Sequence, residues 1–174
     1  MPFASEAEMY PPVCVWLERL LREKQPASTV QVYDASRKSL ARLLKQTGLT
    51  ANVPLEWPSW DIHVDIVGLA IDAKITELAF VECKTTPITL RHLSQLLGYS
   101  RVALPQYAFI VSPQGPSDAL KSLLVTYRRT DVLAYDQREG KFSGSLIVAR
   151  WDKEAATLDY GSLIAADVNF QGRL

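Results

Sequence analysis

Residues 61–84 of the chain read DIHVDIVGLAIDAKITELAFVECK. Apolar and polar residues alternate over 61–66 in a segment that continues to about 70, residues 72–74 are typical of a turn, and the segment 75–83 is mostly apolar. Alternation with period two is the pattern of a half-buried strand, and a longer apolar run fits a buried one. The stretch therefore predicts two antiparallel strands joined by a short turn.

The expected turn sets the register of this hairpin. With its centre between Ala73 and Lys74, Asp65 lies opposite Glu82. Directly opposed side chains have Cβ atoms about 4.5–5.5 Å apart. Lys84 is two residues beyond Glu82, so it lies on the same face one step along the strand.

Two opposed carboxylates at the ends of apolar strands repel each other unless a cation lies between them. Their oxygens are hard ligands that suit Mg²⁺ or Mn²⁺ better than zinc. A lysine beside such a site can orient water or stabilise charge on a phosphate, and this combination is suited to phosphodiester hydrolysis. The alternative is a structural ion pair between Asp65 and Lys84 at the end of a strand.

A helix over 90–104 is expected next, with Thr89 as its N-cap and Pro105 after its end. Its leucines at 90, 93, 97 and 104 fall on one stripe, which predicts the buried face. The opposite side carries a polar row that could line the end of the strands. The residues of this row are Arg91, His92, Gln95 and Tyr99.

Charge is divided along this half of the chain. Residues 56–82 contain six acidic residues and one lysine. Residues 84–130 contain six basic residues, Arg101 among them, and one aspartate. An acidic hairpin beside a basic helical flank suits a polyanion whose phosphate meets a cation.

The remaining elements complete an α/β pattern. We expect helices over 11–24 and 35–48, the second with Asp34 as N-cap, and a helix over 117–129. Strands are expected over 53–57 and 107–111, and a closing hairpin pairs 132–135 with 146–151 around Gly140. The last twenty or so residues give no clear signal. Residues 1–174 are read as one domain, with a core over about 6–112 and a C-terminal helix and hairpin over about 117–152.

The second of these helices places Lys38, Arg42 and Lys45 on one side and its leucines on the other. The basic side is either a solvated face or a contact to a nucleic-acid backbone.

Composition narrows the class of protein. The 19 Lys and Arg residues balance the 19 Asp and Glu residues, so binding of nucleic acid through bulk positive charge is not expected. Two cysteines do not make a disulfide scaffold, and neither a signal peptide nor a membrane span is recognisable. A cytoplasmic protein without membrane contact is expected.

Asp65, the Glu82-Cys83-Lys84 triplet and the segment QLLGY at 95–99 together resemble the PD-(D/E)xK nuclease superfamily. The QxxxY element is similar to the branch that contains recombination helicase–nuclease and lambda-exonuclease-type domains. The resemblance covers roughly residues 6–111. It implies a restriction-endonuclease-like core with the order αβββαβ and a mixed sheet flanked by helices, followed here by an extra helix and a C-terminal β-hairpin.

The resemblance also implies roles for individual residues. Asp65 and Glu82 would ligate Mg²⁺ or Mn²⁺, Lys84 would position or activate the attacking water, and Gln95 and Tyr99 would hold the substrate strand or the water. A glutamate before the first helix would join the metal site, with Glu6 preferred over Glu8. Asp61 shares a face with Asp65, so it remains an alternative metal ligand.

Two functions follow as expectations. The first is a metal-dependent nuclease that acts on DNA and leaves a 5′-phosphate. The second is a catalytically weak or inactive module of the same fold that binds nucleic acid or a protein partner, as a homo-oligomer or with a partner subunit. The residues expected to contact nucleic acid are Lys38, Arg42, Lys45, Arg91, His92 and Arg101.

Overall fold

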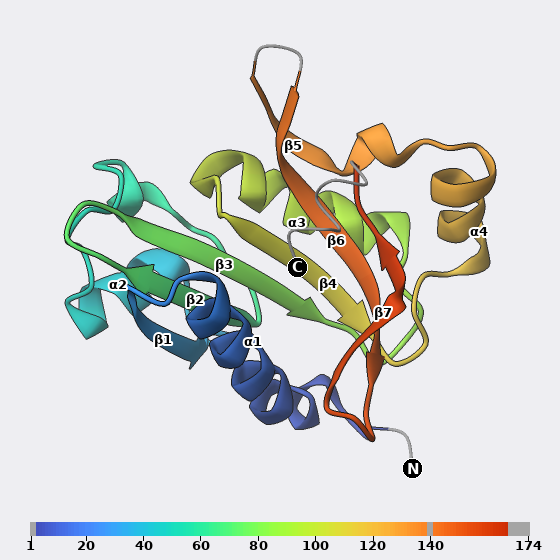
Figure 1. The fold of residues 1–174 in the computed structure, drawn as a ribbon, viewed down its shortest axis with the longest axis horizontal. Coiled ribbons are helices and arrows are strands. Elements are labelled where there is room, and N and C mark those ends of the chain that lie inside the picture. The colour runs from blue at the N-terminus through green and yellow to red at the C-terminus, as the bar shows by residue number, and fades with distance from the viewer. Residues whose placement is uncertain (1–2, 139–140, 167–174) are drawn as a thin grey trace.

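A computed structural model describes residues 3–138 and 141–166. Within these residues a mixed sheet of seven strands has helices on both faces, so the expected α/β class is confirmed (Figure 1). The helices are α1 (Tyr10–Lys24), α2 (Leu40–Thr47), α3 (Leu90–Ala103) and α4 (Asp118–Lys121), with shorter helical turns η1 (Glu6–Glu8), η2 (Trp57–Ser59), η3 (Ser122–Thr126) and η4 (Thr130–Leu133). The strands are β1 (Thr29–Asp34), β2 (Ile66–Ile71), β3 (Thr76–Cys83), β4 (Tyr107–Ser112), β5 (Ala134–Arg138), β6 (Lys141–Asp152) and β7 (Thr157–Ile164).

The sheet combines two kinds of pairing. Strands β1, β2 and β3 form an antiparallel meander, and β3, β4 and β6 are parallel neighbours. Both β5 and β7 pair antiparallel with the long strand β6. As a result, the carboxyl ends of β3 and β4 and the start of β2 lie at the same edge of the sheet.

Two apolar layers hold the helices on the sheet. Helix α1 packs on one face through Val13, Trp16, Leu17, Leu20 and Leu21, whose spacing forms one stripe of the helix. Burying such a side chain stabilises the fold by roughly 1.5–3 kcal/mol. Helices α2 and α3 pack on the opposite face, against a layer of side chains from β2, β3, β4 and β6.

An aromatic cluster lies in the α1 layer. The ring of Trp16 meets Phe109 of β4 edge to face at a centroid distance of 5.0 Å, and it meets Trp151 of β6 at 5.9 Å. Edge-to-face pairs of this kind add stability beyond the area that they bury. The cluster therefore ties α1 to the middle of the sheet.

Three expectations about the first half of the chain are wrong. The segment 53–57 is not a strand, because it forms a loop that leads into η2. The first strand is β1, whose TVQVYD sequence pairs with β2 over its whole length. Asp34 caps a turn through Ser36 and not a helix, whereas the N-cap of α2 is Ser39, whose hydroxyl accepts from the Arg42 amide at 3.4 Å. Three strands thus precede α3 as expected, but α2 lies between the first two.

Later elements also differ from expectation. The predicted helix over 117–129 is shorter, comprising α4 and η3. Residues 132–133 belong to η4 and not to a strand. Strand β7 was not expected, and Gly140 of the predicted turn lies outside the described residues. The helix over 11–24 and the strand over 107–111 are confirmed to within one residue.

The buried stripe of α3 differs from the predicted leucine stripe. Its buried residues are Leu93, Leu96, Ser100 and Ala103, whereas Leu90 and Leu104 are exposed by about half. The helix is thus rotated so that Leu96 faces the core. In consequence Tyr99 is partly buried against the core, while Gln95 remains exposed.

Candidate active site

The two predicted carboxylates lie at the sheet edge described above. The register of the β2–β3 hairpin pairs Ile66 with Val81, as predicted, so Asp65 and Glu82 form the next opposed pair just beyond the ladder. The backbone amide of Lys84 donates to the backbone carbonyl of Val111 at 2.8 Å, and this bond holds the residue after β3 against β4. Ligands of open α/β sheets commonly bind outside the carboxyl ends of the strands.

Asp65 is fixed at both of its carboxylate oxygens. The Tyr10 hydroxyl donates to Oδ1 at 2.9 Å, and the backbone amide of Cys83 donates to Oδ2 at 2.8 Å. Burial raises the pKa of Asp65 more than these two donors lower it, so its pKa lies above the usual value.

Glu82 lies beside Lys84 and is almost enclosed. The Lys84 ammonium is 3.0 Å from Glu82 Oε1, and the side chains are only 14% and 10% exposed. Burial, followed by repulsion from Asp65, raises the pKa of Glu82 to about 7 despite the neighbouring ammonium.

Lys84 also contacts Glu6, at 3.3 Å from Oε2. Burial lowers the pKa of Lys84, but the nearby carboxylates, Glu82 first, raise it by more. Its pKa is therefore above the ordinary value, and the side chain carries a positive charge at neutral pH in this arrangement.

Among the described residues, no three Asp, Glu, His or Cys side chains gather as a metal-ligand cluster. The Lys84 ammonium lies between Glu82 and Glu6, where it already neutralises part of their charge. The donor set nevertheless fits Mg²⁺ or Mn²⁺, because Asp65 and Glu82 present hard oxygens. After burial, repulsion from Asp65 contributes to the raised pKa of Glu82, and a cation between the two carboxyls would reduce this repulsion.

The first turn of α3 lies close enough to this cluster for the charge of Lys84 to affect His92. Burial, then the charge of Lys84, lowers the pKa of His92, so its ring is neutral at pH 7. The Thr89 amide donates to His92 Nδ1 at 3.3 Å, which leaves the ring proton on Nε2. Arg91 is exposed next to it.

Other predicted residues are not joined to the cluster. The side chains of Gln95 and Tyr99 form no hydrogen bond to any described residue, and Arg101 is exposed in the last turn of α3. On the opposite flank, Arg42 and Lys45 of α2 are exposed, and Lys38 donates to Gln46 at 3.1 Å.

The sequence leaves Glu8 open as an alternative to Glu6, and Asp61 as an alternative to Asp65; in the structure each alternative lies elsewhere. Glu8 accepts from the amide of Ala4 at 2.9 Å, whereas Glu6 contacts Lys84. The Asp61 side chain is 89% exposed and pairs with His63 at 3.0 Å. The geometry thus gathers Glu6 and Asp65, and not Glu8 or Asp61, around Lys84.

Sequence reasoning missed Tyr10. The residue begins α1, 55 positions before Asp65, and only the docking of α1 on β2 brings the two together. A tyrosine just before Pro11 in an amphipathic helix carries no signal of such a contact, because the periodicity accounts for its apolar ring alone.

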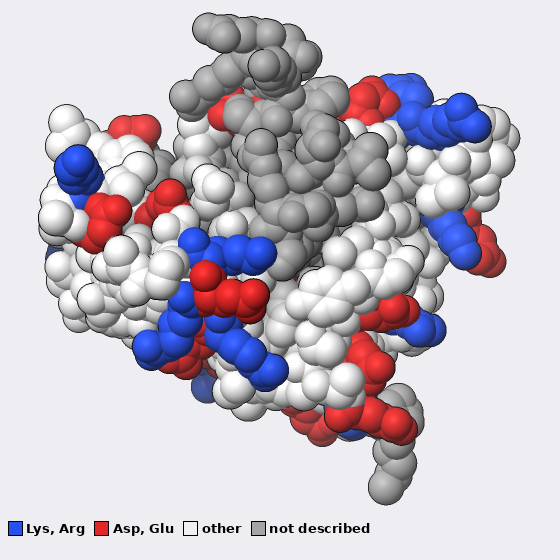
Figure 2. All heavy atoms as spheres, viewed as in Figure 1, with Lys and Arg blue, Asp and Glu red and all other residues white. Residues whose placement is uncertain are grey.

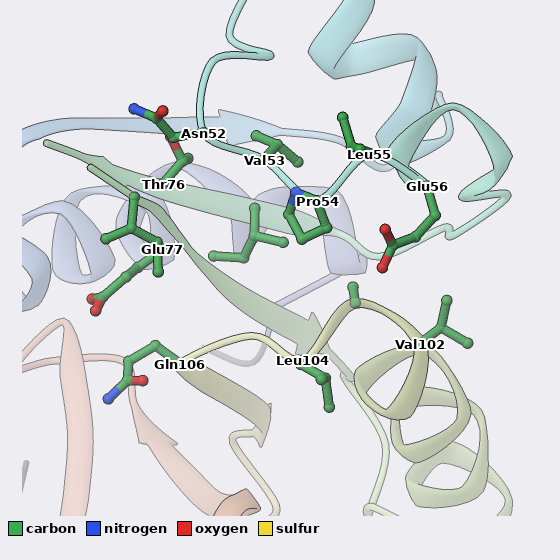
Figure 3. Close-up of a pocket in the computed structure, with 13 residues that line it drawn as sticks. Asn52, Val53, Pro54, Leu55, Glu56, Thr76, Glu77, Val102, Leu104 and Gln106 are labelled. Carbon is green, nitrogen blue, oxygen red and sulfur yellow. The ribbon is translucent and has the colours of Figure 1, made fainter. Parts of the chain in front are cut away.

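A groove apart from this cluster lies at the other end of β3. It has a volume of about 470 Å³ and is lined by the loop with Pro54, Leu55 and Glu56, the start of β3 and the end of α3. Figure 3 shows this loop on one side of the opening and Val102 and Leu104 on the other. The groove is mostly apolar, so it does not offer the chemistry of the acid–lysine cluster.

Comparison with known proteins gives no relative: no family model matches the chain, and no curated protein or solved structure is significantly similar to it. Within the described residues, no helix has both the length and the apolar character needed to cross a lipid bilayer.

Proposed function

We propose that the protein is a metal-dependent nuclease that hydrolyses phosphodiester bonds in DNA. The observation that carries the proposal is the convergence of Asp65, Glu82 and Lys84 at one strand end, with two carboxyls whose pKa values are raised and a charged lysine 3.0 Å from one of them. Carboxylates and a lysine at an open sheet edge are suited to a hard cation and a phosphate.

The order of elements supports the same class. Leaving α2 aside, the chain runs α1, β1, β2, β3, α3, β4, with an antiparallel meander followed by a parallel strand. This is the αβββαβ order of the restriction-endonuclease-like core to which the sequence motifs are similar. The insertion of α2 between β1 and β2 is a departure from that order.

In the proposed site, Asp65 and Glu82 hold Mg²⁺ or Mn²⁺. The cation, when bound, would neutralise the two carboxylates and polarise the phosphate. Glu6 lies on the far side of Lys84 and would limit how the ammonium moves. Gln95 and Arg91, both exposed on α3, are available to the substrate strand.

The raised pKa of Lys84 defines what this residue can do. A lysine that stays charged donates hydrogen bonds but does not accept a proton, so we assign Lys84 to orienting the water and stabilising the charge that develops on phosphate. The water oxygen would then form the new bond to phosphorus while the bond from phosphorus to O3′ breaks. The leaving O3′ would take up the proton that the water gives up, by way of solvent, which yields a 5′-phosphate and a 3′-hydroxyl.

The test is the Lys84→Met variant, which keeps the length of the side chain and removes its charge. With Mg²⁺ or Mn²⁺ present, wild-type protein should degrade plasmid or single-stranded DNA, and the variant should be slower by about 10²–10³-fold. Lys74→Met, in the exposed turn at the other end of the hairpin, is the matched control and should cleave as the wild type does. A wild type that cleaves neither substrate would contradict the proposal.

The second candidate is a binding module of the same fold. It is favoured by the ion pairs of Lys84, which satisfy Glu82 and Glu6 without a metal, and by a net charge of zero. Such a module would bind DNA equally well in its wild-type and Glu82→Ala forms and would show no metal-dependent cleavage.

A further inference from the structure

Tyr10 stands out because its hydroxyl has a single partner among the described residues, and that partner is a proposed metal ligand. The phenol donates to Asp65 Oδ1 at 2.9 Å from the first turn of α1. The ring packs against the α1 layer of the core, so its position is set by apolar contacts and not by the hydrogen bond.

Asp65 receives its two donors on different oxygens. Tyr10 occupies one site of Oδ1, and the Cys83 amide occupies one site of Oδ2 at 2.8 Å. An ionised carboxylate offers about four acceptor positions, so each oxygen keeps one free. Donors on both oxygens stop the carboxylate from turning about its χ2 bond and aim the free positions in a fixed direction.

The two donors differ in what they depend on. The Cys83 amide belongs to β3 and is present whenever the hairpin forms. The Tyr10 hydroxyl is present only when α1 lies on the sheet, which also brings Glu6 to Lys84. The direction of the Asp65 carboxylate therefore depends on the packing of α1 against the sheet.

We propose that Tyr10 is a positioning residue that orients the Asp65 carboxylate for the cation. The inference rests on the proposed function, because it concerns the same metal site. Groups that hold metal ligands in place commonly change metal affinity or activity by 10–100-fold when they are removed. Tyr10→Phe removes only the hydroxyl and keeps the packing of the ring.

A calorimetric titration of the metal-free protein with Mn²⁺ tests the proposal. We expect Tyr10→Phe to bind Mn²⁺ at least tenfold more weakly than wild type while its circular dichroism is unchanged. The matched control is Tyr135→Phe, which removes another buried hydroxyl, one that donates to the Pro105 carbonyl at 2.7 Å away from the site. This control should bind Mn²⁺ with wild-type affinity.

The outcomes separate the two proposals. Equal affinity of Tyr10→Phe and wild type would overturn the role of Tyr10, as would an equal loss in both tyrosine variants, which would indicate a general loss of stability. Wild-type protein that binds Mn²⁺ no better than Glu82→Gln would instead contradict the proposed metal site itself.

Discussion

Glu82 combines burial with a charge that the fold does not fully compensate. Its side chain is 10% exposed, and burial together with Asp65 raises its pKa from the usual 4.5 to about 7. A carboxyl in such surroundings is ionised at a cost to the folded state unless another cation is present. The instability is concentrated at the residue to which the proposed chemistry assigns a ligand role.

This cost predicts a pH dependence of stability. Because the folded-state pKa of Glu82 lies above the unfolded value, its contribution to stability is fully present below about pH 4.5 and is lost as the pH rises through about 7. In EDTA, the free energy of unfolding of wild type should therefore fall relative to that of Glu82→Gln between these limits. Denaturant titrations at several pH values measure the difference, and parallel curves for the two proteins would refute the assignment.

The sequence predicts that Asp65, Glu82 and Lys84 lie together because all three belong to one hairpin or follow it directly. The turn of the β2–β3 hairpin sets a register that the alternation of side chains already contains, and the structure has that register. Tyr10 was out of reach because its contact spans 55 residues and depends on how a helix docks. The preference for Glu6 over Glu8 rests on the interpretation of Glu8 as a capping residue and not on the geometry of the site.

At the scale of elements, the leucines of α1 pack directly over a glycine of the sheet. A Cβ at Gly68 of β2 would lie 2.6 Å from Leu21 Cδ1 and 3.0 Å from Leu17 Cδ2. Real Cβ atoms essentially never approach to 2.6 Å, so a side chain at this position would push the ends of these leucine side chains aside. Gly68 thus leaves the space that Leu17 and Leu21 fill between α1 and the sheet.

Gly68→Ala should lower the free energy of unfolding by about 1–3 kcal/mol, because the added methyl overfills a packed layer. The matched control is Gly98→Ala in α3, where a Cβ would meet nothing within 4 Å. This control should raise stability by about 0.5–1 kcal/mol, since alanine favours a helix interior over glycine. Chemical denaturation of both variants measures the effect, and a neutral Gly68→Ala would show that Leu17 and Leu21 repack around the added methyl without cost.

Elements were missed where local signals were weak or misleading. β1 alternates only over TVQVYD, and Asp34 at its end is typical of an N-cap, so the sequence does not predict this strand. β7 carries Gly161, which weakens the strand signal, and it is held by its pairing with β6 and by Leu158 in the core. The apolar residues at 53–57 lie in a loop because Pro54 interrupts them, and Pro58 follows within η2, which begins at Trp57.

For the whole molecule, charge is balanced rather than one-sided. The chain has a net charge of zero, and the face in Figure 2 carries basic and acidic side chains next to each other. Binding of DNA would therefore depend on a few local contacts near the site and not on the overall field.

Arg91, exposed at the start of α3 beside His92, is the basic residue expected to make such a contact. Arg91→Gln should weaken DNA binding several-fold at moderate salt and reduce the slope of log affinity against log salt by about 1. Fluorescence anisotropy in EDTA measures both quantities, with Lys74→Gln as the control. An unchanged slope in Arg91→Gln would remove the first turn of α3 from the DNA interface.

The aromatic cluster of Trp16, Phe109 and Trp151 has an optical consequence. The indole rings of Trp16 on α1 and Trp151 on β6 have centroids 5.9 Å apart, so their electronic transitions couple. Helix α1 also carries Tyr10. The near-ultraviolet circular dichroism spectrum of the native protein therefore reports, without an added label, whether α1 is packed on the sheet.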